Sequence, residues 1–367
     1  LALARAELSF WQSAAKQVWF TSARLREGQE CSTTDLLSAV ALERCDEYST
    51  AKQSVAAQMR QHGRARLISV VDHHGPVIPK DEKVIGGARL FEDQAQCPFR
   101  AFALHRLRVR PLEEATLGLD PRAHGNLLHM ALEYFWHEVG SQVNLVSLAD
   151  DALSAQILSC IDRSLDDNNV ALRLRELERT RLLSLMLEWF THCEKRRAAF
   201  DVEELEVERE VSYQGFNLTL KVDRVDRLPS GQKLIIDYKT GTNNNPKGWA
   251  EARIENPQLP LYALISDNVE GVSYAQIAIN DCRFKGIASD SDLLRGVVSR
   301  IKSGDTEIAD WESWLRHWRT SLDALAEELR TGLATITPTK KACQYCDLPA
   351  LCRIDDIRDE HTELEAE

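Results

Sequence analysis

The sequence predicts an α/β protein with a mixed central sheet, flanking helices and additional helical segments. Three observations predict it. Strand-like segments cluster in the second half of the chain, long segments of helical period precede them, and another helix separates the last strand from the others. The 367 residues, 44% of them hydrophobic and 28% charged, suffice for a sizeable core in one or two domains.

Helical period dominates the first half of the chain. In residues 122–139 the apolar side chains recur at i, i+3, i+4, i+7 and i+11 and form one stripe, namely Leu128, Ala131, Leu132, Phe135 and Val139. Residues 91–107 are also expected to be helical, with Pro98 in a first turn. Further helices are expected over 1–20, 148–165 and 174–200.

Strand character appears at 203–227 and at 233–239, and Pro229-Ser230-Gly231 between them is a turn signal. These segments predict a hairpin. After a loop rich in turn formers, Asn256-Pro257 predicts the start of a helix and residues 272–279 a further strand.

The helix expected from Asp310 has one apolar face that indicates packing. That face comprises Trp311, Trp314, Leu315, Trp318, Leu322, Leu325 and Leu329.

Composition excludes several classes of protein. No apolar run approaches the ~20 residues of a membrane span and no signal core opens the chain, so a cytoplasmic location without membrane contact is expected. The net charge of −12 argues against nonspecific coating of nucleic acid, although a nuclease needs only a local basic track. No P-loop is present, so no ATP motor is expected. Because the chain opens in a helix without an initiator Met, we expect a piece of a longer polypeptide.

The hairpin carries two carboxylates that are expected to face each other. Asp237 and Lys239 alternate with apolar residues and point to one face of their strand. If the hairpin is symmetric about Ser230, Asp223 lies opposite Asp237. Like charges so placed are unfavourable unless a divalent cation such as Mg²⁺ or Mn²⁺ binds between them. The alternative is a solvated ladder of ion pairs formed by Asp223, Arg224, Asp226 and Arg227.

These motifs resemble a known nuclease core. Asp223 in Val-Asp-Arg-Val-Asp, followed by Asp237-Tyr238-Lys239-Thr240-Gly241, is similar to the PD-(D/E)XK nuclease superfamily. The segment from Gly125 through His129 to Glu133 and the pair Gln258 and Tyr262 resemble the RecB/AddB branch. The resemblance spans roughly residues 86–355 and implies a restriction-endonuclease-like core.

The resemblance also implies a role for each site residue. His129, Asp223, Asp237 and the Tyr238 carbonyl would hold the metal ion, and Lys239 would position or activate the attacking water. Gln258 would orient Lys239 or the substrate. Glu133 would either join the site or form a salt bridge, and Tyr262 would contact DNA or serve only in packing.

Nine cysteines in a long chain without an export signal predict metal chemistry or core packing rather than disulfides. Cys97, Cys343, Cys346 and Cys352 resemble the AddB and CRISPR-adaptation nucleases, in which such a set holds a [4Fe–4S] cluster. A structural Zn²⁺ is the alternative, because four thiolates suit either. The remaining cysteines are interpreted as small apolar residues, namely Cys31, Cys45, Cys160, Cys193 and Cys282.

A cluster of arginines is the candidate phosphate track. Arg100, Arg106 and Arg108 lie in a stretch without acidic residues, and they either contact DNA or pack on acidic neighbours.

The expected function is that of a Mg²⁺- or Mn²⁺-dependent deoxyribonuclease in DNA repair, an exonuclease on single-stranded or unwound DNA. Residues 1–85 would end a helicase-like domain and residues 86–367 would form the nuclease domain, with a helicase partner or upstream domain delivering the strand. Two alternatives from other classes are a catalytically silent Fe–S-stabilised scaffold that binds DNA or a partner, and a Zn-dependent interaction module.

Overall fold

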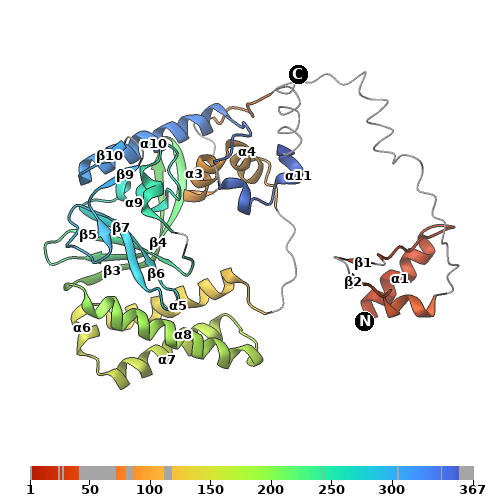
Figure 1. Ribbon diagram of the computed structural model, residues 1–367, viewed down its shortest axis with the longest axis horizontal. Helices are drawn as coiled ribbons and strands as arrows, with labels where there is room; N and C mark the ends of the chain where they lie inside the picture. The colour runs from red at the N-terminus through yellow and green to blue at the C-terminus, as the bar shows by residue number, and fades with distance from the viewer. Residues whose placement is uncertain are drawn as a thin grey trace. The chain divides into compact units, whose positions relative to one another are not determined.

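The computed structural model divides into two compact units, Leu1–Val71 and Asp72–Glu367 (Figure 1). It describes residues 2–23, 25–26, 29–40, 72–79, 86–110, 118–242, 244–303, 306–339 and 341–354. No helix among these residues is both long and apolar enough to cross a bilayer.

Among the described residues of the N-terminal unit lies the helix α1 (Ala2–Ala14), none of whose residues is buried. The other described elements there are β1 (Leu25–Arg26), β2 (Gln29–Glu30) and η1 (Asp35–Ala39). Residues 41–71 and 80–85 lie outside the described residues, so the assignment of residues 1–85 to a helicase-like domain stays a prediction.

A six-stranded sheet forms the centre of the second unit, in the order β3-β4-β5-β6-β7-β8. Its strands are β3 (Asp201–Tyr213), β4 (Phe216–Arg227), β5 (Lys233–Lys239), β6 (Val269–Gln276), β7 (Arg283–Ala288) and β8 (Val297–Val298). The pairs β5–β6 and β7–β8 are parallel, and the other neighbours are antiparallel. The predicted mixed sheet is therefore confirmed.

The strand character predicted for residues 203–227 is confirmed, and the segment contains two strands. β3 and β4 are joined by a turn at Gln214 and Gly215, whose φ angles are 48° and 79°. Positive φ at both central residues is the requirement of a type I′ hairpin turn, and glycine meets it without steric cost.

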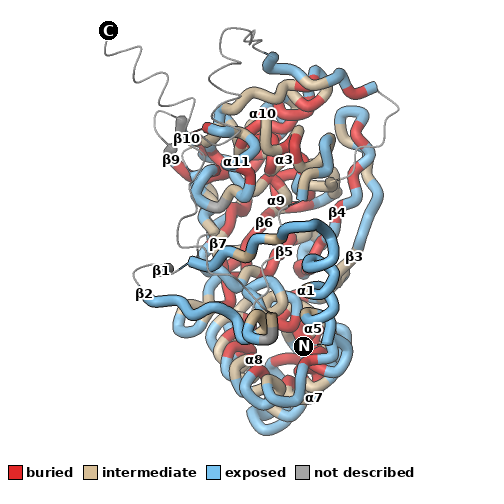
Figure 2. Tube along the Cα trace, turned by 90° about the vertical axis from the view of Figure 1, so that its right-hand side faces the viewer, coloured by how far each residue is buried: buried red, intermediate tan, exposed pale blue. Residues whose placement is uncertain are grey.

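Helices cover both faces of the sheet (Figure 1). One face carries α5 (Pro121–Val139), α6 (Gln142–Ser147), α7 (Asp150–Asp167) and α8 (Leu172–His192). The other carries α3 (Gly87–Gln96), α9 (Gln258–Ile265) and α10 (Trp311–Thr331). Two hydrophobic cores result, one on each face, and the buried residues follow the strands and the inner helix faces in Figure 2.

The predicted stripes of α5 and α10 are buried, as expected of packing faces. Each helix begins at an aspartate whose carboxylate accepts a backbone N–H, Asp120 for α5 and Asp310 for α10. Such caps fix where these two helices start.

Residues 91–107 are largely helical and Pro98 lies in a helical first turn, as predicted, but the helical segment is not continuous. Cys97 interrupts it in an extended conformation, with φ −166° and ψ 119°. The following Pro98 disfavours helical backbone at the preceding residue. The segment is therefore divided into α3, α4 (Pro98–Ala101) and a π-helical turn, η2 (Phe102–Arg106).

The remaining described elements of the second unit are smaller. They are η3 (Glu194–Arg196), η4 (Pro246–Ala250), β9 (Ile301–Ser303), β10 (Thr306–Ile308), η5 (Ala342–Tyr345) and α11 (Pro349–Cys352).

Candidate active site

The register of β4 against β5 is that of a hairpin symmetric about Ser230. The ladder ends with the pair Arg224–Ile236, one step before Asp223 and Asp237. At that step the Asp223 carboxylate accepts a hydrogen bond from the backbone N–H of Tyr238 at 2.8 Å. Strand pairing thus ends where the carboxylates begin.

Side-chain alternation along β4 also breaks at this point. Val222 and Val225 both pack into the same core, although residues three apart on a regular strand point to opposite faces. The irregularity places Arg224 on the other face of the sheet, over Trp136 of the second core.

Asp237 and Lys239 form an ion pair at the carboxyl end of β5. Lys239 Nζ lies 2.6 Å from Asp237 Oδ2. Burial lowers the pKa of Lys239, but the carboxylates of Asp237 and Asp223 outweigh this effect and raise it. The ammonium group is therefore held charged beside Asp237.

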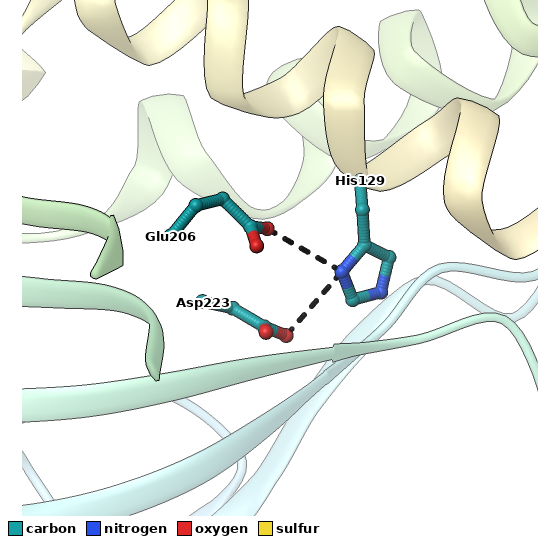
Figure 3. A group of neighbouring side chains, drawn as sticks. All are labelled: His129, Glu206 and Asp223. Carbon is teal, nitrogen blue, oxygen red and sulfur yellow. Dashed lines mark ion pairs between the residues drawn. The ribbon is translucent and has the colours of Figure 1, made fainter. Parts of the chain in front are cut away.

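His129 reaches the site from helix α5. Its Nε2 lies 3.0 Å from the Tyr238 carbonyl oxygen. Its Nδ1 lies 3.5 Å from Asp223 Oδ2 and 3.6 Å from Glu206 Oε1 (Figure 3). The Tyr238 carbonyl and the two carboxylates all accept hydrogen bonds. A neutral imidazole has a single N–H group and cannot donate from both ring nitrogens. A cation, either a proton or a metal ion, is needed beside Nδ1.

Glu206 is a site residue that the sequence interpretation missed. It lies on β3 between the pairs Leu205–Arg224 and Val207–Val222, so its place is opposite Asp223. Its φ of 50° is unusual for a residue other than glycine, and such strain concentrates at functional sites. The hairpin symmetry that pairs Asp223 with Asp237 would have found Glu206 from the Gln214-Gly215 turn.

Glu206 is also anchored by a neighbour. Lys221 Nζ lies 2.6 Å from its Oε2, which leaves Oε1 buried and directed at His129 without a hydrogen bond.

The three side chains of His129, Glu206 and Asp223 could hold a metal ion. One donor atom from each lies within 4.8 Å of the other two. Two carboxylate oxygens and an imidazole nitrogen suit Mn²⁺ or a similar divalent cation. Asp237, which the resemblance includes among the ligands, pairs with Lys239 and is not part of this group.

Repulsion between the acids is visible in the pKa of Asp223. Burial and the nearby Asp237 carboxylate raise that pKa to about 7. A bound divalent cation would oppose both effects, because it stabilises the charged carboxylate.

Gln258 and Tyr262 lie one turn apart on α9. The Gln258 amide donates to the Lys221 carbonyl at 3.2 Å and so holds β4 beside the site. Tyr262 is buried in the core, and burial together with Asp223 and Asp237 raises the pKa of its hydroxyl. Glu133 lies 3.8 Å from His137 Nε2 and forms a salt bridge with it, which is one of the two roles expected for Glu133.

Arg224 forms a buried ionic network behind the site. Its guanidinium lies 2.7 Å from Glu194 and 2.6 Å from Asp226, and it donates to the Tyr238 hydroxyl at 3.1 Å. The side chains of Arg224 and Asp226 are fully buried, so the alternative of a solvated ladder is wrong for this pair. The network fixes Tyr238, whose backbone bonds both Asp223 and His129.

The four cysteines singled out by the sequence line one small cavity. Cys97 comes from the break between α3 and α4, whereas Cys343, Cys346 and Cys352 come from the segment after α10. Arg100 lines the same cavity, and its side chain contacts Cys346. Sets of four thiols are known as ligands of both iron–sulfur clusters and zinc ions.

The arginines of the predicted phosphate track differ in their surroundings. Arg100 donates to Asp93 at 2.7 Å, and Arg106 donates to the Pro76 carbonyl at 3.1 Å. Arg108 is exposed. Two of the three arginines are therefore engaged in packing contacts.

Three comparisons place these observations among known proteins. The sequence pattern described as the PD-(D/E)XK nuclease superfamily matches residues 90–353. The chain is 22% identical over 345 residues to one subunit of the ATP-dependent helicase/deoxyribonuclease of Clostridium kluyveri (strain NBRC 12016). That alignment covers 72% of this chain and 29% of the relative, so the chain spans less than a third of the relative's length. The crystal structure of SSO0001 is 15% identical, with a TM-score of 0.25, over 72% of this chain and 94% of that one.

The superfamily match covers well over half of the chain and contains every residue of the site described above. The sheet with helices on both faces agrees with it. This chain belongs to the PD-(D/E)XK nuclease superfamily.

Proposed function

We propose that this chain is a divalent-metal-dependent deoxyribonuclease that hydrolyses phosphodiester bonds. The observation that carries the proposal is the convergence of His129, Glu206 and Asp223 beside the Asp237–Lys239 pair. A carboxylate-rich site with a lysine beside it combines a place for a cation with a fixed positive charge.

His129, Glu206 and Asp223 would hold the ion, with Asp237 and the Tyr238 carbonyl beside them. A bound Mg²⁺ or Mn²⁺ would polarise the phosphoryl oxygen and lower the pKa of a coordinated water. Lys239, kept protonated by Asp237, would orient that water and stabilise charge that develops on the phosphate. Gln258 would keep Lys221, and through it Glu206, in place.

For the cysteine cavity we propose a structural [4Fe–4S] cluster, with Zn²⁺ as the alternative. The four thiols that line it come from both ends of the second unit, so a cluster would close a very long loop. Broad absorbance near 400 nm in anaerobically purified protein is expected for iron, whereas zinc would give none.

The biological setting follows the relative named above. We propose exonuclease action on single-stranded or unwound DNA in repair, and a helicase partner or upstream helicase-like domain that includes residues 1–85. Arg108 stays a candidate for DNA contact because it is exposed.

The test uses end-labelled single- and double-stranded DNA with Mg²⁺, Mn²⁺ or EDTA. Cleavage is expected only with metal, and Lys239→Ala should reduce the rate by ~10²–10³-fold. Glu133→Gln, a substitution on α5 of a residue that pairs with His137, serves as the matched control. Equal cleavage in EDTA or by Lys239→Ala would refute the proposal. Binding without any cleavage would favour the silent scaffold.

A further inference from the structure

A groove with a cavity volume of about 950 Å³ opens beside the candidate active site. Its walls come from α3, from the loop after β5, from β7 and from the segment between α10 and the cysteines. This volume has room for part of one polynucleotide strand.

The groove begins at the catalytic strand. Thr242, which lines it, follows Lys239 by only three residues. Lys285 lines it from β7, in the register row that joins Asp237, Tyr274 and Lys285 across three strands. Paired residues share a face of the sheet, so Lys285 lies on the face of Asp237, about 10 Å away at the usual strand spacing.

Cations are spread along the groove in a chain whose net charge is −12. Lys285 Nζ donates to Gln276 Oε1 at 2.7 Å and to the Thr242 carbonyl at 3.3 Å, so these bonds hold it in place without neutralising its charge. Lys341 also lines the groove and is exposed. Arg89 is 67% exposed, and its Nε lies 3.8 Å from Asp93.

The acidic residues of the groove would repel a polyanion, but they are fewer than its basic residues. Glu92 accepts a hydrogen bond from Gln96 at 3.2 Å, and burial raises its pKa. Glu255 is the second groove carboxylate. The cations therefore leave a net positive lining, and the groove reaches Lys239 through Glu92, whose charge acts on that ammonium group.

Side-chain amides line the same groove, among them Asn244, Gln96 and Gln344. Amides both donate and accept, as the edges of bases do, and the Watson–Crick edges are open only in an unpaired strand. The groove therefore combines cations that suit phosphates with amides that suit base edges.

We propose that this groove is the track of a single nucleic-acid strand that leads to the active site, with Lys285, Lys341 and Arg89 contacting its phosphates. The inference rests on the proposed function, because it takes the strand to be the substrate. It assigns phosphate recognition to residues outside the arginine cluster that the sequence suggested.

The test measures binding of a fluorescent single-stranded oligonucleotide to the full chain in EDTA, where no cleavage is expected, at several salt concentrations. Each phosphate contact contributes about 0.7 to the slope of log K against log salt for single strands. The double variant Lys285→Gln/Lys341→Gln should therefore lower the slope by about 1.4. The control Arg163→Gln/Arg300→Gln removes two exposed cations outside the groove lining and should leave it unchanged.

Equal slopes for the groove and control variants would overturn the inference. If Lys285→Gln lowers the thermal midpoint, the single variant Lys341→Gln, at an exposed position, still tests it with an expected decrease of about 0.7. A blunt duplex that competes as well as the unlabelled strand would overturn the assignment to a single strand. Groove-dependent binding by a chain that never cleaves DNA would instead refute the proposed function and leave this inference standing.

Discussion

At the residue scale, the site is governed by the arrangement of charge around His129. The imidazole contacts the Tyr238 carbonyl through Nε2 and two carboxylates through Nδ1. One of these two carboxylates belongs to Glu206, whose Oε1 is buried and lies near Nδ1. Glu206 lies outside the sequence motifs, and its substitution therefore tests the metal centre most directly.

Glu206→Gln is expected to weaken Mn²⁺ binding at least about 10-fold, because it removes an anionic oxygen from the group of three donors. Electron paramagnetic resonance of free Mn²⁺ during a titration measures the affinity without reference to catalysis. Glu208→Gln, an exposed change on the same strand, should leave the affinity unaltered. Identical affinities for the two variants would show that Glu206 is not a ligand.

Arg224→Met should destabilise the fold by about 3–5 kcal/mol, because it leaves Glu194 and Asp226 buried with a partner removed. Urea unfolding followed by circular dichroism measures the change in free energy. Arg227→Met is the matched control, since Arg227 is the exposed end of the same strand and its change should stay within about 0.5 kcal/mol. A loss of similar size in both variants would contradict the account of the network.

At the element scale, two hairpins in series bring the acids together. The turn at Gln214 and Gly215 sets β3 against β4, and the turn at Ser230 sets β4 against β5. Asp223 on the shared strand therefore faces Glu206 on one side and approaches Asp237 on the other. The break at Cys97 has a corresponding effect, because it turns a thiol toward the C-terminal cysteines.

Cys346→Ser is expected to loosen the second unit while its folded fraction keeps the chemistry. Linking Cys97 to Cys343 closes a loop of about 250 residues, whose entropy is worth about 5 kcal/mol. The expected result is a lower and broader thermal transition, with the cleavage rate per folded molecule retained at low temperature. Cys160, which is buried in the helical core, is the control position as Cys160→Ala. Unchanged cooperative unfolding of Cys346→Ser would contradict a structural cluster.

At the scale of the whole molecule, the site lies where both cores meet the sheet. His129 belongs to a helix of one core, and Tyr262 to a helix of the other, while the acids lie on the strands between them. Metal binding should therefore be linked to folding of the second unit as a whole.

Mn²⁺ at 100 times its dissociation constant should add about 2.7 kcal/mol to the free energy of unfolding, because only the folded chain assembles the three donors. Differential scanning calorimetry with Mn²⁺ and after chelation measures the shift. Asp223→Asn should abolish most of the shift while the midpoint of the metal-free protein stays near that of the wild type or rises, since a repelling charge is removed. An equal shift in this variant would place the ion elsewhere.

The α5 stripe, the alternation of β5 and the register about Ser230 could be predicted from the order of residues. These features depend on periods and turns within one segment or between adjacent ones, which the chain encodes directly. The set of four cysteines comes from distant segments and was implied only by the resemblance to known nucleases. The folded chain was needed to show that Glu206 joins His129, that Arg224 is buried, that Arg100 and Arg106 have packing partners and that Lys285 and Lys341 line one groove. Each of these depends on which faces of distant elements pack together, and that choice is made by burial of two cores rather than by any local pattern.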